Sequence, residues 1–492
     1  MNALYSKTRK SEKHADRQLS SKWNSIDWKS VKESVNRLQT RIAKAVQEGK
    51  WNLVKRLHYL LTHSYYAKLL AVRIVTQNRG RRTPGIDGEI WSSATSKMQA
   101  TLKLTDKHYK STPLRRIYIP KPGSDTKRPI SIPTMHDRAM QALYALALQP
   151  VAETLVDKRS FGFRLFRSAQ DACQQAFACL AHPNSSQWIL ECDIKGCFDN
   201  ISHEWLKANI PMDLSILTQF MKAGFVFEGN LFPTRSGTPQ GGLISPLLAN
   251  MTLDGIEASL AKHFPRMKVH LIRYADDCVI TAPSKEIAER LKRIIQEFLI
   301  VRGLELSDNK TFITHIDEGF NFLGWNFKKY KGVLLIKPSI KSIQKVIEKV
   351  RDIMHKAKAW TQKQLIGELN PIIRGWTNYH KHVVAHEAFA RMDFVMWGQL
   401  WHWAKRRHPN KGHWWIVDKY WHREGSRNWV FKSDTNKLVL FEDAKVRRHP
   451  WLRLDANPFL ERNYFIERMD SLKKKNSGVQ TKLSFFMHDC PN

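Results

Sequence analysis

The sequence predicts an α+β fold over residues 81–330, followed by a helical region over 331–440 and a basic C-terminal segment over 441–492. Up to residue 330, apolar runs of strand length alternate with segments of helical periodicity. After that point apolar residues recur only at helical spacing. Ten of the 17 tryptophans lie at or beyond Trp360, mixed with His, Arg and Lys. The chain therefore divides into chemically different parts.

The first 80 residues are expected to form a basic, helical N-terminal extension. Apolar positions recur at helical spacing from Val31 to Val46, and again after Gly49, which breaks the first helix. Residues 78–88 (NRGRRTPGIDG) contain the Gly and Pro that are typical of a loop. This loop marks the start of the mixed region.

Five segments define the rest of the chain. The pattern predicts two short strands around a PGSD turn in 113–135, and a helix over 136–156. A buried strand ending in a turn is expected in 188–198 (WILECDIKGCF), and a strand pair in 270–281 (HLIRYADDCVIT). An apolar stripe over 343–354 predicts an amphipathic helix.

The charge points to a polyanionic partner. Lys and Arg total 80 against 45 Asp and Glu, a formal net charge of +35. Such an excess repels itself in a compact state, and nucleic acid is the first candidate to compensate it, ahead of a membrane surface. No run of about twenty apolar residues occurs, so no membrane association is expected. The N-terminus is polar and basic and has no apolar signal core, so an intracellular location is expected.

Three aspartates stand next to apolar strands. Asp276 and Asp277 lie in RYADDCVI, and Asp193 follows WILEC. Unpaired carboxylates beside buried residues are costly, and a hard cation such as Mg²⁺ or Mn²⁺ is the simplest compensation. Two such ions about 4 Å apart would activate a 3′-hydroxyl and stabilise a leaving pyrophosphate. Taken singly, these aspartates are equally typical of solvated turns and helix caps.

Two further segments fit a nucleotide-binding site. Lys121 and Arg128 flank the PGSD turn, where a strand pair could direct both toward a triphosphate. Residues 236–250 (SGTPQGGLISPLLAN) are glycine-rich, which lets a backbone approach a substrate closely. The alternatives are solvated hairpin charges and an ordinary loop before a helix.

Taken together and in order, IKGCFDN, GTPQGGLISPLLAN, RYADDCVI, LSDNKTFITH and FNFLGWNF resemble the motifs of reverse transcriptases. The upstream segments RRTPGIDG and RRIYIPKPG, and GELNPIIRGWTNYH downstream, are similar to those of group II intron-encoded proteins, the maturase reverse transcriptases. The resemblance covers roughly residues 30–450. It implies a right-hand polymerase, with fingers and a palm built on an antiparallel sheet, followed by a helical thumb and maturase domain.

The resemblance also implies roles for individual residues. The catalytic carboxylates, which would hold two Mg²⁺ ions, are Asp193, Asp276 and Asp277. The residues that would bind the incoming deoxynucleoside triphosphate are Arg115, Lys121, Arg128, Phe198 and Gln240. A bulky ring at Phe198 would collide with a ribose 2′-hydroxyl; plain core packing is the alternative.

The basic, aromatic segment RGWTNYHKH (374–382) is expected to bind RNA. Its cations suit phosphates and its rings suit unpaired bases, and the residues assigned to this role are Arg374, Trp376, Tyr379 and Lys381. For Trp376 a place in the core is equally expected. The tail from 441 is expected to contact DNA but to lack a zinc-supported HNH nuclease, because beyond residue 459 it offers only His488 and Cys490 as ligands.

The resulting hypothesis is an RNA-directed DNA polymerase and maturase. It would bind its group II intron RNA, assist RNA-catalysed splicing and support retromobility by copying the intron into DNA, with a DNA primer and deoxynucleoside triphosphates as substrates. The alternatives are a domesticated reverse transcriptase in host defence or DNA repair, and a splicing-only RNA-binding maturase. The sequence is compatible with a monomer or a homodimer. With an intact polymerase and no transit signal, the expected location is a bacterial cytoplasm, within a nucleoid-associated ribonucleoprotein, and an organelle is the alternative.

Overall fold

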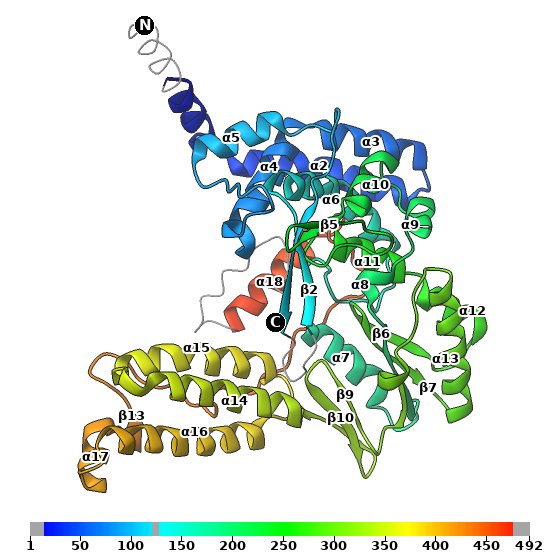
Figure 1. Ribbon diagram of the computed structural model, residues 1–492. Helices are drawn as coiled ribbons and strands as arrows, with labels where there is room; N and C mark the ends of the chain where they lie inside the picture. Colours follow the sequence, from blue (N-terminus) through cyan, green and yellow to red (C-terminus); the bar gives the residue numbers. More distant parts are fainter. Residues whose placement is uncertain (1–13, 121–126, 476–492) are drawn as a thin grey trace, which may run out of the picture.

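The computed structural model describes residues 14–120 and 127–475. Figure 1 shows a helical block, a central sheet region and a bundle of long helices that projects to one side. The N-terminal helices pack around one almost fully buried helix, α6. The helices of this block are α2 (Trp28–Gln47), α3 (Trp51–His63), α4 (Tyr65–Gln77), α5 (Ala94–Lys103) and α6 (Met135–Leu155). The predicted N-terminal helices and the helix over 136–156 are thus confirmed.

A four-stranded antiparallel sheet forms the centre. Its strand order is β6-β7-β3-β8, and its strands are β3 (Trp188–Asp193), β6 (His270–Tyr274), β7 (Asp277–Ala282) and β8 (Phe312–His315). Because side chains alternate along a strand, neighbouring residues enter different cores. Leu190 and Ile280 join the core of the N-terminal block, whereas Ile189 and Val279 join the core of the helix bundle. This sheet therefore connects the two halves of the molecule.

Helices flank this central sheet. Helix α7 packs beside β6, and α13 packs against β3 and β7. The helices between and around the strands are α7 (Ala169–Leu180), α8 (Cys197–Asn200), α9 (His203–Asn209), α10 (Leu214–Lys222), α11 (Ser245–Leu253), α12 (Ile256–His263) and α13 (Lys285–Ile300). No helix in the described part of the chain is long and apolar enough to cross a membrane.

A second sheet, with strand order β2-β1-β4-β5, lies above the central one in Figure 1. Its strands are β1 (Leu114–Pro120), β2 (Lys127–Ile132), β4 (Phe225–Phe227) and β5 (Asn230–Phe232). Strands β1 and β2 pair antiparallel, as the sequence predicts. The PGSD turn, together with Lys121, falls outside the described residues.

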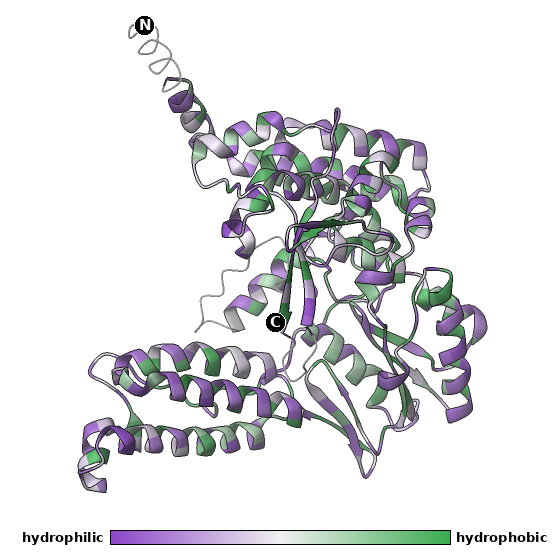
Figure 2. Ribbon diagram, in the orientation of Figure 1, coloured by the Kyte–Doolittle hydropathy of each residue, from purple (hydrophilic) through white to green (hydrophobic). Residues whose placement is uncertain are grey.

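A three-stranded sheet leads into the helix bundle, in which α14 packs against both α15 and α16. Figure 2 shows hydrophilic and hydrophobic residues alternating along these helices, which is the pattern of amphipathic elements. The elements of this part are β9 (Phe320–Phe322), β10 (Trp325–Tyr330), β11 (Val333–Pro338), α14 (Ile340–Lys356), α15 (Gln362–His380), α16 (His386–Arg407), α17 (His413–Tyr420), β12 (Trp421–Glu424) and β13 (Arg427–Phe431).

The last described segment, which lies in the region predicted as a basic DNA-binding tail, returns to the centre of the molecule (Figure 1). Helix α18 (Arg462–Lys475) carries Arg468, whose guanidinium forms an ion pair with the fully buried carboxylate of Asp171 on α7. His449 Nε2 lies 2.8 Å from the same carboxylate. Thr40 on α2 donates to the carbonyl of Phe459 at 3.0 Å. Buried polar contacts of this kind attach the segment to the sheet region and to the N-terminal block.

Candidate active site

The three predicted carboxylates converge at one end of the central sheet. Asp193 is the last residue of β3 and lies directly opposite Asp277, the first residue of β7. Tyr274 pairs with Asp277 in the β6–β7 hairpin, so Ala275 and Asp276 form its two-residue turn. Ala275 has a φ of 58°, the left-handed conformation that such tight turns require. The sheet register thus brings together residues more than 80 positions apart.

A close backbone contact supports this turn. A Cβ atom at Gly162 would lie 2.3 Å from the backbone nitrogen of Ala275, so only glycine fits. The neighbouring Phe161 N–H donates to the carbonyl of Arg273 at 2.9 Å. The loop before α7 is therefore seated directly against the carboxylate hairpin.

A buried polar network lies beneath the turn. The side chain of Arg273 is about 1% exposed and forms an ion pair with Asp254. It also donates to Asn250 Oδ1 at 3.1 Å and to the carbonyl of Ala275 at 3.4 Å. The amide of Asn250 in turn donates to the carbonyl of Gly162 at 2.7 Å. The sequence analysis missed these residues, although a cation inside the apolar strand HLIRY was a usable signal.

The electrostatics of the carboxylates suit a divalent cation. Burial raises the pKa of Asp276, and the nearby Asp193 adds to the effect. The protein packed around Asp277 raises its pKa to about 6, with further contributions from Asp276 and Asp193. Each carboxylate is thus held close to other negative charge, which a bound cation would relieve.

The carboxylates are not arranged as a finished metal cage. Among the described residues, no three His, Cys, Asp or Glu side chains are grouped closely enough to hold an ion. Instead, Lys310 Nζ lies 3.1 Å from Asp193 Oδ2, and its ammonium neutralises part of the charge. The hard oxygen donors nevertheless fit Mg²⁺ or Mn²⁺ better than zinc.

Phe198 lies beside Asp276, and both line one small pocket with Phe163 and Asn250. The Phe198 ring is half-buried and meets the ring of Phe163 edge-on, with centroids 6.3 Å apart. The side chain is thus partly packed and partly open at the site itself.

The glycine-rich loop docks on the turn after β3. Gly237 has a φ of 80°, and a Cβ atom there would lie 2.5 Å from the backbone of Asp199. Gln240 Nε2 donates to Asp199 Oδ2 at 3.0 Å, and the Gln240 carbonyl accepts from the N–H of Ser131 on β2 at 2.7 Å. Gln240 therefore links strand β2 of the second sheet to helix α8, which follows the Asp193 strand.

The two described arginines that were predicted to bind the triphosphate differ in their distance from the carboxylates. Arg128 on β2 pairs with Ile119 on β1, so its side chain lies on the same face of the sheet as that of Arg115. Arg115 precedes Ile119 by four residues, so the two arginines lie at opposite ends of the strand pair. Burial raises the pKa of Asp276, and the exposed Arg128 lies near enough to offset part of that rise. Arg115 instead lies near Arg138: burial lowers the pKa of Arg138, and the charge of Arg115 adds to this effect. Among the described residues of this set, Arg128 is therefore the cation nearest the carboxylates.

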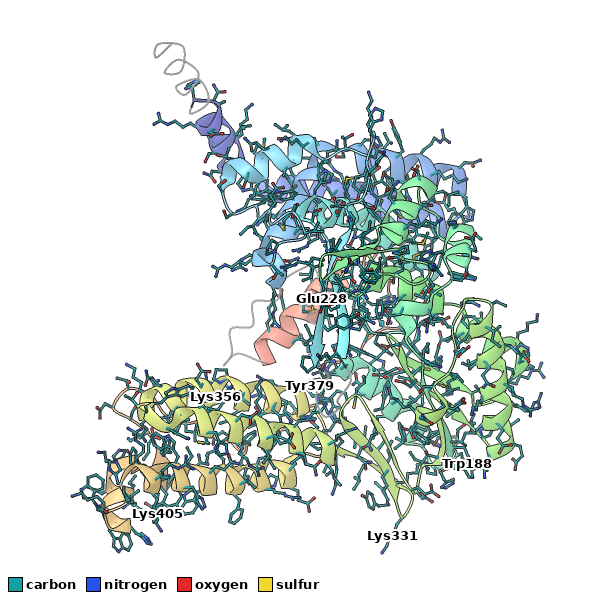
Figure 3. All side chains as sticks on the ribbon, in the orientation of Figure 1. Trp188, Glu228, Lys331, Lys356, Tyr379 and Lys405 are labelled. Carbon is teal, nitrogen blue, oxygen red and sulfur yellow. The ribbon has the colours of Figure 1, made fainter. Side chains whose placement is uncertain are left out.

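The RNA-binding candidates on and just after α15 also differ: the two rings pack against neighbouring elements, whereas the two cations are at least partly exposed. Trp376 donates from its indole to Ser342 Oγ at 3.2 Å. Tyr379 donates to the carbonyl of Leu323 at 2.8 Å and stacks on Trp325 with centroids 4.6 Å apart. Tyr379 therefore joins α15 to the sheet that precedes the bundle, at the end where Figure 3 labels it, and Trp376 joins α15 to α14. The other two candidates are the exposed Arg374 and the half-buried Lys381.

Comparison with known families reproduces the order of these parts. Residues 23–104 match the N-terminal domain of reverse transcriptase, and 119–327 match reverse transcriptase (RNA-dependent DNA polymerase). Residues 343–421 match the group II intron, maturase-specific domain. The three matched segments contain the helical block, the central sheet and most of the helix bundle, whereas most of strand β1 of the second sheet lies between the first two matches.

Named relatives agree with these matches. The group II intron-encoded protein LtrA of Lactococcus lactis is 31% identical over 362 residues, which cover 58% of this chain and 59% of LtrA. Protein YkfC of Escherichia coli is 28% identical and is covered over 87% of its length, with 59% of this chain aligned. Maturase-like protein 1 of Euglena gracilis is 26% identical over 72% of this chain and 76% of its own length. The chain thus spans about three fifths of the length of LtrA, and it is similar in order to the N-terminal and polymerase domains of reverse transcriptases and to the maturase-specific domain of group II introns.

Proposed function

We propose that this protein is an RNA-directed DNA polymerase that also acts as the maturase of a group II intron. The observation that carries the proposal is the register that sets Asp193 opposite Asp277, beside Asp276 at the hairpin turn. The match of residues 343–421 to the maturase-specific domain adds the second activity.

In this proposal the three carboxylates hold two Mg²⁺ ions, which Mn²⁺ can replace. When bound, such ions activate the primer 3′-hydroxyl and stabilise the leaving pyrophosphate. Arg128, Lys121 and Arg115 bind the triphosphate of the incoming deoxynucleotide. The proximity of Arg128 to Asp276 supports its part in this role.

Two side chains would select the nucleotide. Phe198 lines the pocket beside Asp276, where its ring would collide with a ribose 2′-hydroxyl. Gln240 would line the nucleotide pocket from the glycine-rich loop, in an orientation held by its hydrogen bond to Asp199. Deoxynucleotides would then be preferred over ribonucleotides.

The helix bundle α14–α16 would act as the thumb that holds the template–primer duplex. Arg374 and Lys381 on its inner end would contact RNA phosphates, with Trp376 and Tyr379 shaping that surface from within. The exposed Lys445 and Arg448, just before the returning C-terminal segment, would contact DNA backbone. The net charge of +35 supports these contacts, because Lys and Arg side chains neutralise nucleic-acid phosphates.

The biological partner would be the host intron RNA, whose splicing the protein assists and which it copies into DNA, in a bacterial cytoplasm. A splicing-only maturase is disfavoured by the intact carboxylate set. A domesticated reverse transcriptase in host defence or DNA repair is disfavoured by the maturase-specific match.

Primer extension on an RNA template, with Mg²⁺ and deoxynucleotides, tests the polymerase. Asp276→Ala abolishes cDNA synthesis and leaves intron RNA binding nearly intact, whereas Asp317→Ala, at a carboxylate 63% exposed, retains synthesis. Extension by the Asp276 variant would refute the carboxylate assignment. Addition of the protein to intron RNA at low magnesium tests the maturase, because splicing should then depend on protein.

A further inference from the structure

The outer side of α16 carries an unusual row of large rings. Phe394, Trp397 and Trp401 recur at helical spacing, and the first two are 78% and 40% exposed. Trp429 on β13 is 46% exposed and approaches Trp397 with centroids 6.3 Å apart. We call these four residues the tryptophan face. Clustered exposed rings of this kind mark a binding surface more often than isolated ones do.

The rings of the tryptophan face are held in place from behind. Trp397 and Trp401 lie nearly parallel, with an interplanar angle of 4° and centroids 5.8 Å apart. The buried Trp421 contacts both of them. Trp429 adopts a φ of 63°, a left-handed conformation that a bulky residue rarely takes and that often accompanies functional sites. The face is therefore a preformed surface.

Cations border this surface. On the same side of α16, Arg391 precedes Phe394 by one turn and Lys405 follows Trp401 by one turn, and both are exposed. Residues 391–432 contain nine Lys and Arg against three Asp and Glu. One of those three, Asp393, accepts from the backbone N–H groups of Phe441 and Glu442, each at 2.9 Å. The local charge thus favours a polyanion.

We propose that the tryptophan face binds unpaired bases of the intron RNA, while Arg391 and Lys405 contact the flanking phosphates. This inference rests on the proposed maturase function. Base–aromatic stacking with bordering cations is the chemistry by which proteins bind unpaired nucleic acid. Because the Trp397 and Trp401 rings already pack on each other with centroids 5.8 Å apart, bases would stack on the exposed ring surfaces rather than between this pair.

The local charge favours nucleic acid over a protein partner, because nine Lys and Arg stand against three Asp and Glu over residues 391–432. The location also differs from that of the segment 374–382. Figure 3 labels Tyr379 at one end of the helix bundle and Lys405 at the other. The tryptophan face lies on α16 and β13, whereas that segment lies on and just after α15, so the face adds a second contact region.

The test uses the full-length protein and a group II intron RNA in equilibrium binding over a salt series. The double variant Trp397→Ala/Trp429→Ala lowers affinity about 10- to 100-fold, the effect of losing one or two stacked bases. The slope of log affinity against log salt stays unchanged, because no phosphate contact is lost. Arg391→Ala/Lys405→Ala instead reduces that slope by about 1.4. The single variant Trp397→Phe, which keeps a stacking ring, retains most of the wild-type affinity.

Trp451→Ala, at a ring 55% exposed outside the face, is the matched control and binds normally. Thermal unfolding of each variant identifies misfolding. If the double variant misfolds, Phe394→Ala, which removes one ring of the face, should lower affinity, and Trp397→Phe, which keeps a ring, should not. Unchanged affinity of a folded double variant overturns the proposal. Loss of a wild-type dimer in the double variant, with RNA affinity unchanged, assigns the face to a second copy and also overturns it. If the wild type binds no intron RNA yet extends primers, it is the proposed maturase function that fails.

Discussion

Replacement of Gly162 by alanine is expected to displace the catalytic hairpin. The new Cβ atom would lie 2.3 Å from the Ala275 nitrogen and 2.8 Å from the Tyr274 carbonyl carbon. Ordinary contact begins near 3.4 Å, so one backbone must move by about 1 Å. Both neighbours are backbone atoms, and neither can rotate away as a flexible side chain would. The displacement is therefore transmitted to Asp276.

A misplacement of about 1 Å in a catalytic constellation costs on the order of 10²-fold in rate. Overpacking costs about 1–3 kcal/mol of stability as well. Single-turnover primer extension should thus fall about a hundredfold in Gly162→Ala, with intron RNA affinity unchanged. The control is Gly367→Ala, because nothing lies within 4 Å of its Cβ position on α15. A folded Gly162→Ala protein with wild-type extension rates would refute the contact as a support of the hairpin.

Three further predictions address selectivity, RNA binding and stability. Phe198→Ala raises ribonucleotide incorporation in primer extension, and an unchanged ratio of ribo- to deoxynucleotide use would assign its ring to packing alone. Replacing Arg374 and Lys381 together by alanine weakens intron RNA binding and reduces the salt slope by about 1.4, whereas an unchanged slope would remove both from the interface. Arg468→Leu removes the guanidinium that pairs with the buried Asp171 carboxylate, although His449 remains beside it, and lowers the free energy of unfolding by about 1.5–3 kcal/mol in denaturant titration. A loss below about 1 kcal/mol would contradict this role.

The candidate site was predictable where its signal is local. The strands around Asp193 and Asp276 follow from short apolar runs, and the turn after Tyr274 follows from polar residues between them. The support for that turn was not predictable. Gly162 and Asn250 are 88 residues apart, and each is ordinary in its own segment. Their hydrogen bond exists only because the loop before α7 and helix α11 meet beneath the hairpin.

The sequence by itself determined the order of the elements, the polymerase and maturase motifs, and the excess of positive charge, because periodicity, residue type and net charge are properties of neighbouring residues. Only the tertiary structure decided which surfaces remain exposed. It placed Trp376 and Tyr379 at an internal junction, exposed Trp397 and Trp429 on one face, and returned the last described helix to Asp171. The physical reason is that apolar rings and charged groups look alike in sequence whether they are buried or exposed, and packing between distant segments decides between the two.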